Sequence, residues 1–214
     1  QCRSNLSNVK DKIPKLNTSE KLTAIDIGGN TGTFVEMLLE DTPYEFDKIL
    51  LFEPVPLYAR WASFKFCNLN ENPKVDVIEC ALSDERKEQK IAVNNYDSNL
   101  GWNTMVDMWQ KEETSDIILV QSFTFDEIFS HLDIKKIDLI KIDVEGYEAK
   151  VLKGMTKTLG GLDNKHPMIV EIADGSRHHD MENLEAEFSK LENIGYSFDD
   201  KKKWPDQTFD LLMN

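Results

Sequence analysis

Three acidic residues stand close together near the middle of the chain. Residues 135–155 read KKIDLIKIDVEGYEAKVLKGM, and Asp143, Glu145 and Glu148 fall at the junction between an apolar half and an amphipathic half. Carboxylates at such a junction can accept a proton, bind a hard cation such as Mg²⁺, or cap the free N–H groups of a helix. The first two uses are chemical and the third is structural, and the local sequence leaves all three open.

A glycine-rich turn is the second feature that could do chemistry. Residues 26–32 read DIGGNTG, between an apolar and an amphipathic segment. Glycines allow a ligand to approach the main chain, and the N-terminus of the following helix attracts an anion. The dinucleotide fingerprint G-x-G-x-x-G is not met, because Asn30 or Thr31 stands where its second glycine is required, and no Walker lysine follows. Asp26, at the start of the turn, favours a ligand that carries an amine.

Glu53 closes the next apolar segment and is placed to bind ribose hydroxyls, as an acid does in dinucleotide-binding folds. A ligand with an adenosine part and an amino-acid tail fits Asp26 and Glu53 together, which points to S-adenosylmethionine. The alternative is structural: Gly28, Gly29 and Gly32 would then only let a helix pack closely on a strand.

Short apolar segments alternate with amphipathic ones along the chain. Strands are predicted at residues 22–27, 47–53, 74–80, 136–143 and 168–172, and helices at residues 31–40, 56–66, 147–159 and 181–194. Residues 90–93 and 117–123 are predicted to be strands that flank a loop, and residues 208–213 a final strand. This alternation predicts an α/β domain at residues 21–214, with a mostly parallel sheet and helices on both faces, after a polar lead-in at residues 1–20.

The predicted strand ends share a chemical feature. Ligands bind parallel sheets beyond the carboxyl ends of the strands, where the strand order reverses. Four candidate acids each stand at the last position of a predicted strand or at the position before it: Asp26, Glu53, Asp143 and Glu171. Asp143 and Glu171 are expected to end neighbouring strands, where their oxygens suit a divalent cation such as Mg²⁺ or Mn²⁺. We therefore expect one cleft lined by acids.

Composition narrows the classes of function. The chain has 214 residues, a net charge of −14 and a sequence pI near 4.7, which argues against a nucleic-acid partner, since such binding needs clustered Lys and Arg. No apolar run reaches the ~18 residues of a membrane span, and the first residues lack the apolar core of a signal peptide. The widely spaced Cys2, Cys67 and Cys80 form no metal or disulfide pattern, so a cytoplasmic location is expected.

Five segments between residues 24 and 172 resemble those of one known family. AIDIGGNTGTFV, LFEPVP, ECALSDE, IDLIKIDVEGYEAKVLKGM and PMIVEI follow in the order found in the FkbM family of S-adenosylmethionine-dependent methyltransferases. The segment at Asp143 is the most specific, since the family carries a D-x-E-G-x-E element there. This chain departs from the family at Gly29, where Ala is frequent, and after Glu171, where Ile172 and Ala173 stand in place of a frequent His.

The resemblance implies a class I methyltransferase fold, which is a Rossmann-like sheet with an antiparallel last strand. It also implies methylation of a hydroxyl oxygen, often on a sugar or a polyketide, and family habit suggests a terminal deoxyhexose such as rhamnose or fucose. The residues assigned to the cofactor S-adenosylmethionine are Asp26, Gly28, Asn30, Glu53 and Ala81.

Two further segments are expected to face the cleft. Residues 174–180, DGSRHHD, place His178 and His179 just after a strand end, where an imidazole can act as a base or bind acceptor hydroxyls. Residues 94–109, NNYDSNLGWNTMVDMW, combine amides with Trp102 and Asn103, and amides with aromatic faces suit carbohydrate recognition. The structural alternatives are a solvated loop for the histidines and a packed surface loop for the tryptophan.

The sequence therefore predicts an O-methyltransferase that acts on a hydroxyl of a sugar or glycan. The candidate catalytic residues are Asp143, Glu145, His178 and His179. The candidate acceptor ligands are Trp102, Asn103 and Glu171, and the candidate metal ligands are Asp143 and Glu171. One rival is an O-methyltransferase of a small hydrophobic natural product. The other is a non-catalytic S-adenosylmethionine-binding domain of a larger glycan-processing polypeptide. A first residue that is Gln rather than Met is compatible with this rival. The acids at the strand ends disfavour it, since a non-catalytic domain does not need them.

Overall fold

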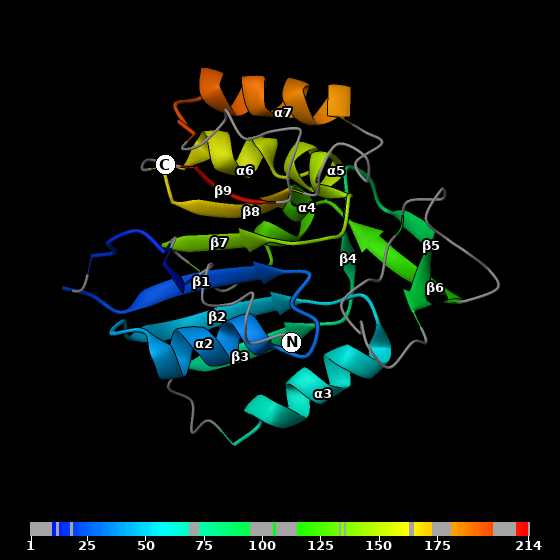
Figure 1. Ribbon diagram of the computed structural model, residues 1–214, viewed down its shortest axis with the longest axis horizontal. Helices are drawn as coiled ribbons and strands as arrows, with labels where there is room; N and C mark the ends of the chain where they lie inside the picture. Colours follow the sequence, from blue (N-terminus) through cyan, green and yellow to red (C-terminus); the bar gives the residue numbers. More distant parts are fainter. Residues whose placement is uncertain are drawn as a thin grey trace.

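The computed structural model describes residues 10–11, 13–17, 19–68, 73–94, 105, 115–132, 134, 136–162, 165–172, 181–198 and 209–213. These residues form two sheets with helices around them (Figure 1). The main sheet contains β1 (Leu22–Ile27), β2 (Phe46–Phe52), β3 (Lys74–Ile78), β7 (Leu139–Ile142), β8 (Met168–Ile172) and β9 (Phe209–Met213). The small sheet contains β4 (Ala81–Leu82), β5 (Lys87–Asn94) and β6 (Ser115–Phe123). The helices are α2 (Thr33–Asp41), α3 (Pro56–Phe66), α4 (Phe125–Phe129), α5 (Glu148–Lys153), α6 (Thr156–Gly161) and α7 (Met181–Asn193).

The main sheet has the strand order β3-β2-β1-β7-β8-β9. β1 pairs in parallel with both β2 and β7, so the strand order reverses beside β1. β2 and β3 are also parallel, as are β7 and β8, whereas β9 runs antiparallel to β8. The prediction of a mostly parallel α/β sheet is confirmed, and so is the antiparallel last strand.

Side chains alternate along the strands between the two faces of the main sheet, and each face packs in its own hydrophobic core. One face packs against α2 and α3, in a cluster that includes Ala24, Leu51, Leu139, Phe34 and Phe66. The opposite face packs against α4, α5, α6 and α7, in a cluster that includes Ile25, Ile140, Phe125, Val151, Leu159 and Phe188. Helices thus cover both faces, as expected for strands that are apolar on both sides. None of the described helices is long and apolar enough to cross a membrane.

The prediction of a single helix at residues 147–159 is wrong, since α5 ends at Lys153 and α6 begins at Thr156. Gly154 accounts for the break. A Cβ added there would lie 2.0 Å from the Ser83 carbonyl oxygen, so the main chain at this turn packs directly on the segment after β4. The Asp126 N–H also donates to the Gly154 carbonyl oxygen at 3.0 Å. The position of the turn is therefore determined by contacts with distant segments rather than by the helical spacing of apolar residues in the sequence.

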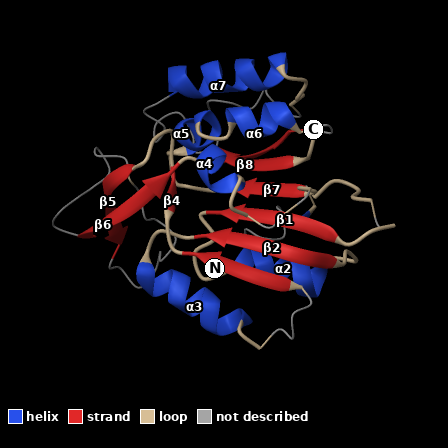
Figure 2. Ribbon diagram, turned by 180° about the vertical axis from the view of Figure 1, so that it is seen from behind, coloured by secondary structure: helices blue, strands red, loops and turns tan. Residues whose placement is uncertain are grey.

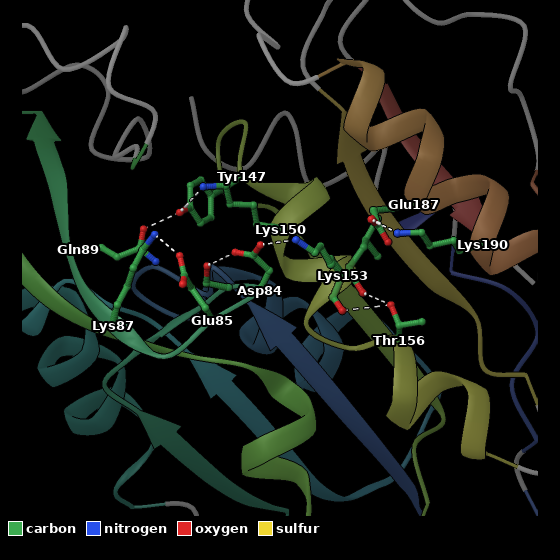
Figure 3. A network of polar contacts seen from close by, with 12 residues as sticks. Asp84, Glu85, Lys87, Gln89, Tyr147, Lys150, Lys153, Thr156, Glu187 and Lys190 are labelled. Atoms are coloured by element: carbon green, nitrogen blue, oxygen red, sulfur yellow. Dashed lines mark hydrogen bonds and ion pairs between the residues drawn. The ribbon is translucent and has the colours of Figure 1, made fainter.

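The small sheet stands beyond the carboxyl ends of the main-sheet strands (Figures 1 and 2). β4 pairs in parallel with β6, and β5 pairs with β6 in antiparallel register. Polar contacts join this sheet to the start of α5 (Figure 3): the Tyr147 hydroxyl donates to Gln89 Oε1, and Lys150 Nζ donates to the same hydroxyl at 3.2 Å. Lys153 Nζ pairs with Asp84 at 2.7 Å. The small sheet is thereby held as a wall beside the edge where ligands of such folds bind.

Candidate active site

A hollow opens at the carboxyl ends of β1, β2 and β7, between the main sheet and the small sheet. It is lined by the turn after β1, the end of β2, parts of β4 and β5, and the loop after β7. The residues that the sequence singled out and that line this hollow are Gly28, Asn30, Glu53, Ala81, Asp143 and Glu145. The expected cleft at the reversal of strand order is therefore present in the structure.

The main chain of the turn after β1 packs directly against the main chain of β2 and of the loop after β7. Gly28 and Asn30 have positive φ angles of 79° and 49°. The N–H groups of Gly28 and Gly29 both donate to the Phe52 carbonyl oxygen at 3.0 Å. A Cβ added to Gly28 would lie 1.9 Å from the Asp143 carbonyl oxygen, so only glycine fits. This turn consequently sets the position of the loop after β7.

Glu53 ties the end of β2 to the same turn. Its Oε2 accepts a hydrogen bond from the Asn30 N–H at 2.8 Å, and its Oε1 accepts one from the Val55 N–H at 2.8 Å. The side chain is buried, and burial raises its pKa to about 7 in spite of these hydrogen bonds. Glu53 also lines the hollow, where a ligand that offers hydroxyl donors would offset part of this cost of burial.

The raised pKa of Glu53 predicts a pH dependence of folding stability. The pKa is about 7 in the folded chain against an ordinary value of 4.5, so between these values the folded state binds more protons than the unfolded state. Stability therefore falls as the pH rises through this window. Glu53→Gln, which cannot ionise, should reduce the fall between about pH 5 and pH 8 by roughly 1 kcal/mol or more. Urea unfolding of both proteins measures this difference, and parallel profiles would contradict it.

Sequence reasoning misses a buried lysine that joins the acids beneath the hollow. Asp26 of β1 and Lys141 of β7 are opposite each other in the strand register. Lys141 Nζ lies 2.9 Å from Asp143 Oδ2 and 3.8 Å from Asp26 Oδ1. Asp26 is completely buried, and within the described part of the chain neither of its carboxylate oxygens accepts a hydrogen bond. Burial raises the pKa of Asp26 to about 6, although the charge of Lys141 opposes the shift.

The sequence does contain a signal for Lys141. It stands between Ile140 and Ile142 in a strand that is otherwise apolar, and a lysine in such a place is buried and must be paired. Burial acts to lower the pKa of Lys141, but the charges of Asp143 and Asp26 outweigh burial and raise the pKa above its ordinary value. The ammonium group thus stays charged at neutral pH and balances the acids around it.

The acidic side chains of the loop after β7 have different roles. Glu148 is buried, and its Oε1 accepts hydrogen bonds from the Gly146 N–H at 3.1 Å and the Val144 N–H at 3.3 Å, which closes the loop. Helix α5 has no side-chain cap, so neither Asp143 nor Glu145 serves as one. Glu145 has a positive φ of 51° and lines the hollow. Burial, and next the charge of Asp143, raise the pKa of Glu145 well above its ordinary value.

Two candidate residues that the structure describes, Asp26 and Glu171, are not among those that line the hollow. Glu171 lies in β8, beside β7, but does not line it. Trp102, Asn103, His178 and His179 lie outside the described residues. Among the residues that the structure describes, no group of three or more His, Cys, Asp or Glu side chains could hold a metal ion.

Comparisons with known proteins agree with this geometry. Residues 26–198 match the family described as the methyltransferase FkbM domain. Hexuronic acid methyltransferase AglP of Haloferax volcanii is 34% identical over 77 residues, which are 36% of this chain and 31% of AglP. Methyltransferase 1 of Beauveria bassiana is 27% identical over 172 residues, which are 70% of this chain and 64% of that relative. The chain thus spans less than two thirds of the length of either relative.

Solved structures share the fold. A methyltransferase FkbM from Methylobacillus flagellatus aligns with a TM-score of 0.59 at 15% identity, over 94% of this chain and 45% of that one. Fibrillarin of Aeropyrum pernix, in complex with S-adenosylmethionine, aligns with a TM-score of 0.54 at 13% identity, over 99% of this chain and 74% of that one. The family match runs from Asp26 in β1 to beyond the end of α7, and so includes the main strands around the hollow. The chain belongs to the methyltransferase FkbM family and has the fold of the S-adenosylmethionine-dependent methyltransferases.

Proposed function

We propose that this protein transfers a methyl group from S-adenosylmethionine to a hydroxyl oxygen of a sugar or glycan. The observation that carries the proposal is that one hollow brings the turn after β1 and Glu53 next to Asp143 and Glu145 of the loop after β7. Membership of a methyltransferase family supports the reaction. The partial similarity to a hexuronic acid methyltransferase supports a carbohydrate acceptor.

The residues of the hollow fit S-adenosylmethionine in charge and polarity. Asp26 supplies buried negative charge beneath the turn at Gly28, and both of its oxygens lack a hydrogen bond from the described residues. Glu53 ends the strand after β1, where an acid binds ribose hydroxyls in related folds. Ala81 and Leu82 of β4 form an apolar wall that suits an adenine ring. The cofactor would supply an electrophilic methyl group on sulfur, and these residues would hold it.

Methyl transfer to an alcohol requires a proton acceptor in a fixed position. Asp143 is our proposed acceptor, because its side chain is 26% exposed and Lys141 holds its Oδ2 at 2.9 Å. Asp143 Oδ1 accepts no hydrogen bond from the described residues, so it is available for the hydroxyl proton. Burial raises the pKa of Glu145, and in its protonated form this side chain can donate a hydrogen bond to a second oxygen of the acceptor. A positioned base contributes roughly 10²- to 10⁴-fold to rate, and alignment of the reactants ~7 to 11 kcal/mol of the barrier.

Glu53→Ala is expected to weaken S-adenosylhomocysteine binding by about 1 to 3 kcal/mol. The variant loses a candidate acceptor for the ribose hydroxyls and also the hydrogen bond that holds Asn30 in the turn. Calorimetric titration of the full chain gives the affinity. Glu88→Ala is the matched control, since Glu88 is an exposed acid on β5 that does not line the hollow. An unchanged affinity in Glu53→Ala would remove Glu53 from the cofactor site.

A methyl-transfer screen tests the proposed function. The protein is incubated with methyl-labelled S-adenosylmethionine and four kinds of acceptor: rhamnosides, fucosides, hexuronic acids and an apolar phenol. Mass spectrometry detects the product, and NMR distinguishes a methyl ether from a methyl ester. A methyl ether on a sugar is the expected product. A product only with the phenol would favour a natural-product enzyme, and cofactor binding without any product would favour a non-catalytic domain. The roles of Trp102, Asn103, Glu171, His178 and His179 in acceptor binding or catalysis stay predictions from the sequence.

A further inference from the structure

We infer that the cation of this site is the ammonium group of Lys141, and that methyl transfer by this chain proceeds without a divalent metal ion. The inference rests on the proposed function for its rate measurement, but its metal-binding measurement needs no acceptor. The sequence predicts a metal at the oxygens of Asp143, which follows β7, and of Glu171, which lies in the neighbouring parallel strand β8.

Lys141 already lies among these acids. Its Nζ is 2.9 Å from Asp143 Oδ2 and 3.8 Å from Asp26 Oδ1, and the charge of Glu171 acts on it as well. The side chain is only 7% exposed, and the ammonium lies 5.6 Å from the centre of the Phe34 ring in α2. A charged group that is buried so deeply keeps its place, because moving away would leave buried acids without a partner.

A divalent ion does not fit beside this ammonium. Mg²⁺ needs near-octahedral oxygen ligands at about 2.1 Å, and one of the two oxygens of Asp143 is already bound by Lys141. An ion on the other oxygen would lie close to a fixed positive charge that little water screens. Within the described ranges, no third side chain of a suitable type completes a set of ligands. The donor set therefore suits an internal ammonium rather than a metal.

Lys141 acts as a positioning residue, because it contacts Asp143 rather than the acceptor. With Oδ2 held by the ammonium, the carboxylate keeps one orientation and presents Oδ1 for the acceptor proton. The same ammonium balances the charge of Asp26 under the cofactor turn. Loss of Lys141 should therefore leave the base in the site but without a fixed orientation.

Metal binding tests the first half of the inference. Mn²⁺ is titrated into the full chain saturated with S-adenosylhomocysteine, and free Mn²⁺ is followed by electron paramagnetic resonance. We expect no bound Mn²⁺ in the wild type and an unchanged rate after treatment with EDTA. Stoichiometric Mn²⁺ binding that is lost in Asp143→Asn would overturn the inference, as would activity that EDTA removes and Mg²⁺ restores. Failure of the proposed function has a different signature, which is the absence of a methylated sugar product from the untreated wild type.

Substitution of Lys141 tests the second half. Lys141→Met should lower kcat by about 100-fold with S-adenosylhomocysteine affinity near the wild-type value, and Lys141→Arg should retain more activity because it keeps the cation. Lys48→Met is the matched control, since Lys48 is a strand lysine that pairs with Asp76 at 3.5 Å. The double variant Asp26→Asn/Lys141→Met removes a buried acid together with the buried cation, which preserves a folded protein for the assay. A wild-type rate in Lys141→Met or in the double variant would overturn the inference.

Discussion

Asp143→Asn is expected to lower kcat and kcat/KM together by roughly 10²- to 10⁴-fold, with S-adenosylhomocysteine affinity close to that of the wild type. Asparagine keeps the size of the side chain and one oxygen within reach of Lys141, but it removes the charge that accepts the proton. The charge of Asp143 is not needed to cap α5, which has no side-chain cap. Turnover, melting temperature and cofactor affinity of the variant should be measured together.

Asp76→Asn is the matched control for this prediction. Asp76 also pairs with strand lysines, Lys48 at 3.5 Å and Lys74 at 3.3 Å, but it lies in β3 and does not line the hollow. Its replacement removes one negative charge and should leave turnover near the wild-type rate. Near-normal turnover in Asp143→Asn would place the base elsewhere, with Glu145, His178 and His179 as the remaining candidates from the sequence.

Gly28→Ala is expected to destabilise the fold by at least about 2 kcal/mol and to abolish measurable cofactor binding. The added Cβ would meet the Asp143 carbonyl oxygen at 1.9 Å and Val144 Cγ1 at 3.2 Å, and a φ of 79° disfavours any residue with a Cβ. The carbonyl group belongs to the main chain and cannot rotate aside, so the turn after β1 and the loop after β7 would have to separate. Thermal unfolding and calorimetric titration measure the two effects.

Gly160→Ala provides the contrast. Gly160 lies within α6, and a Cβ added there would meet only Ile194 Cδ1, at 4.0 Å. Alanine in a helix is favoured over glycine by roughly 0.5 to 1 kcal/mol, so this variant should be as stable as the wild type or slightly more stable. If Gly28→Ala behaved like Gly160→Ala, the close contact between the two loops would not exist in solution.

Local pattern predicts some elements of the fold to the residue. Helix α3 and strand β8 coincide with the predicted segments 56–66 and 168–172, because Pro56 marks the first turn of a helix and an apolar run marks a buried strand. The break between α5 and α6 escapes such reasoning, since it depends on the approach of Gly154 to Ser83 from a distant part of the chain. β4, with only two residues, is too short to show any period.

Some features of the candidate site could likewise be predicted from the sequence, and others could not. Glu53 and Asp143, which both line the hollow, could be placed near each other from the sequence, because parallel strands bring their carboxyl ends to one edge of the sheet. The pairing of Lys141 with Asp26 could not be predicted, because it requires the register of β1 against β7. The sequence leaves the use of Glu148 open, and the folded loop shows a structural one, since its Oε1 accepts hydrogen bonds from the Val144 and Gly146 N–H groups.

The contact between the turn after β1 and the loop after β7 bears on how acceptor scope can be changed. The Asp143 N–H donates to the Ile27 carbonyl oxygen at 3.0 Å, so the separation of the two loops is fixed by the main chain of adjacent strands. Substitutions at Ile91, on the small-sheet wall, reshape the hollow without altering that separation. An insertion or deletion of one residue in either loop alters it directly. Libraries for new acceptors therefore belong on the small sheet, with the lengths of both loops held constant.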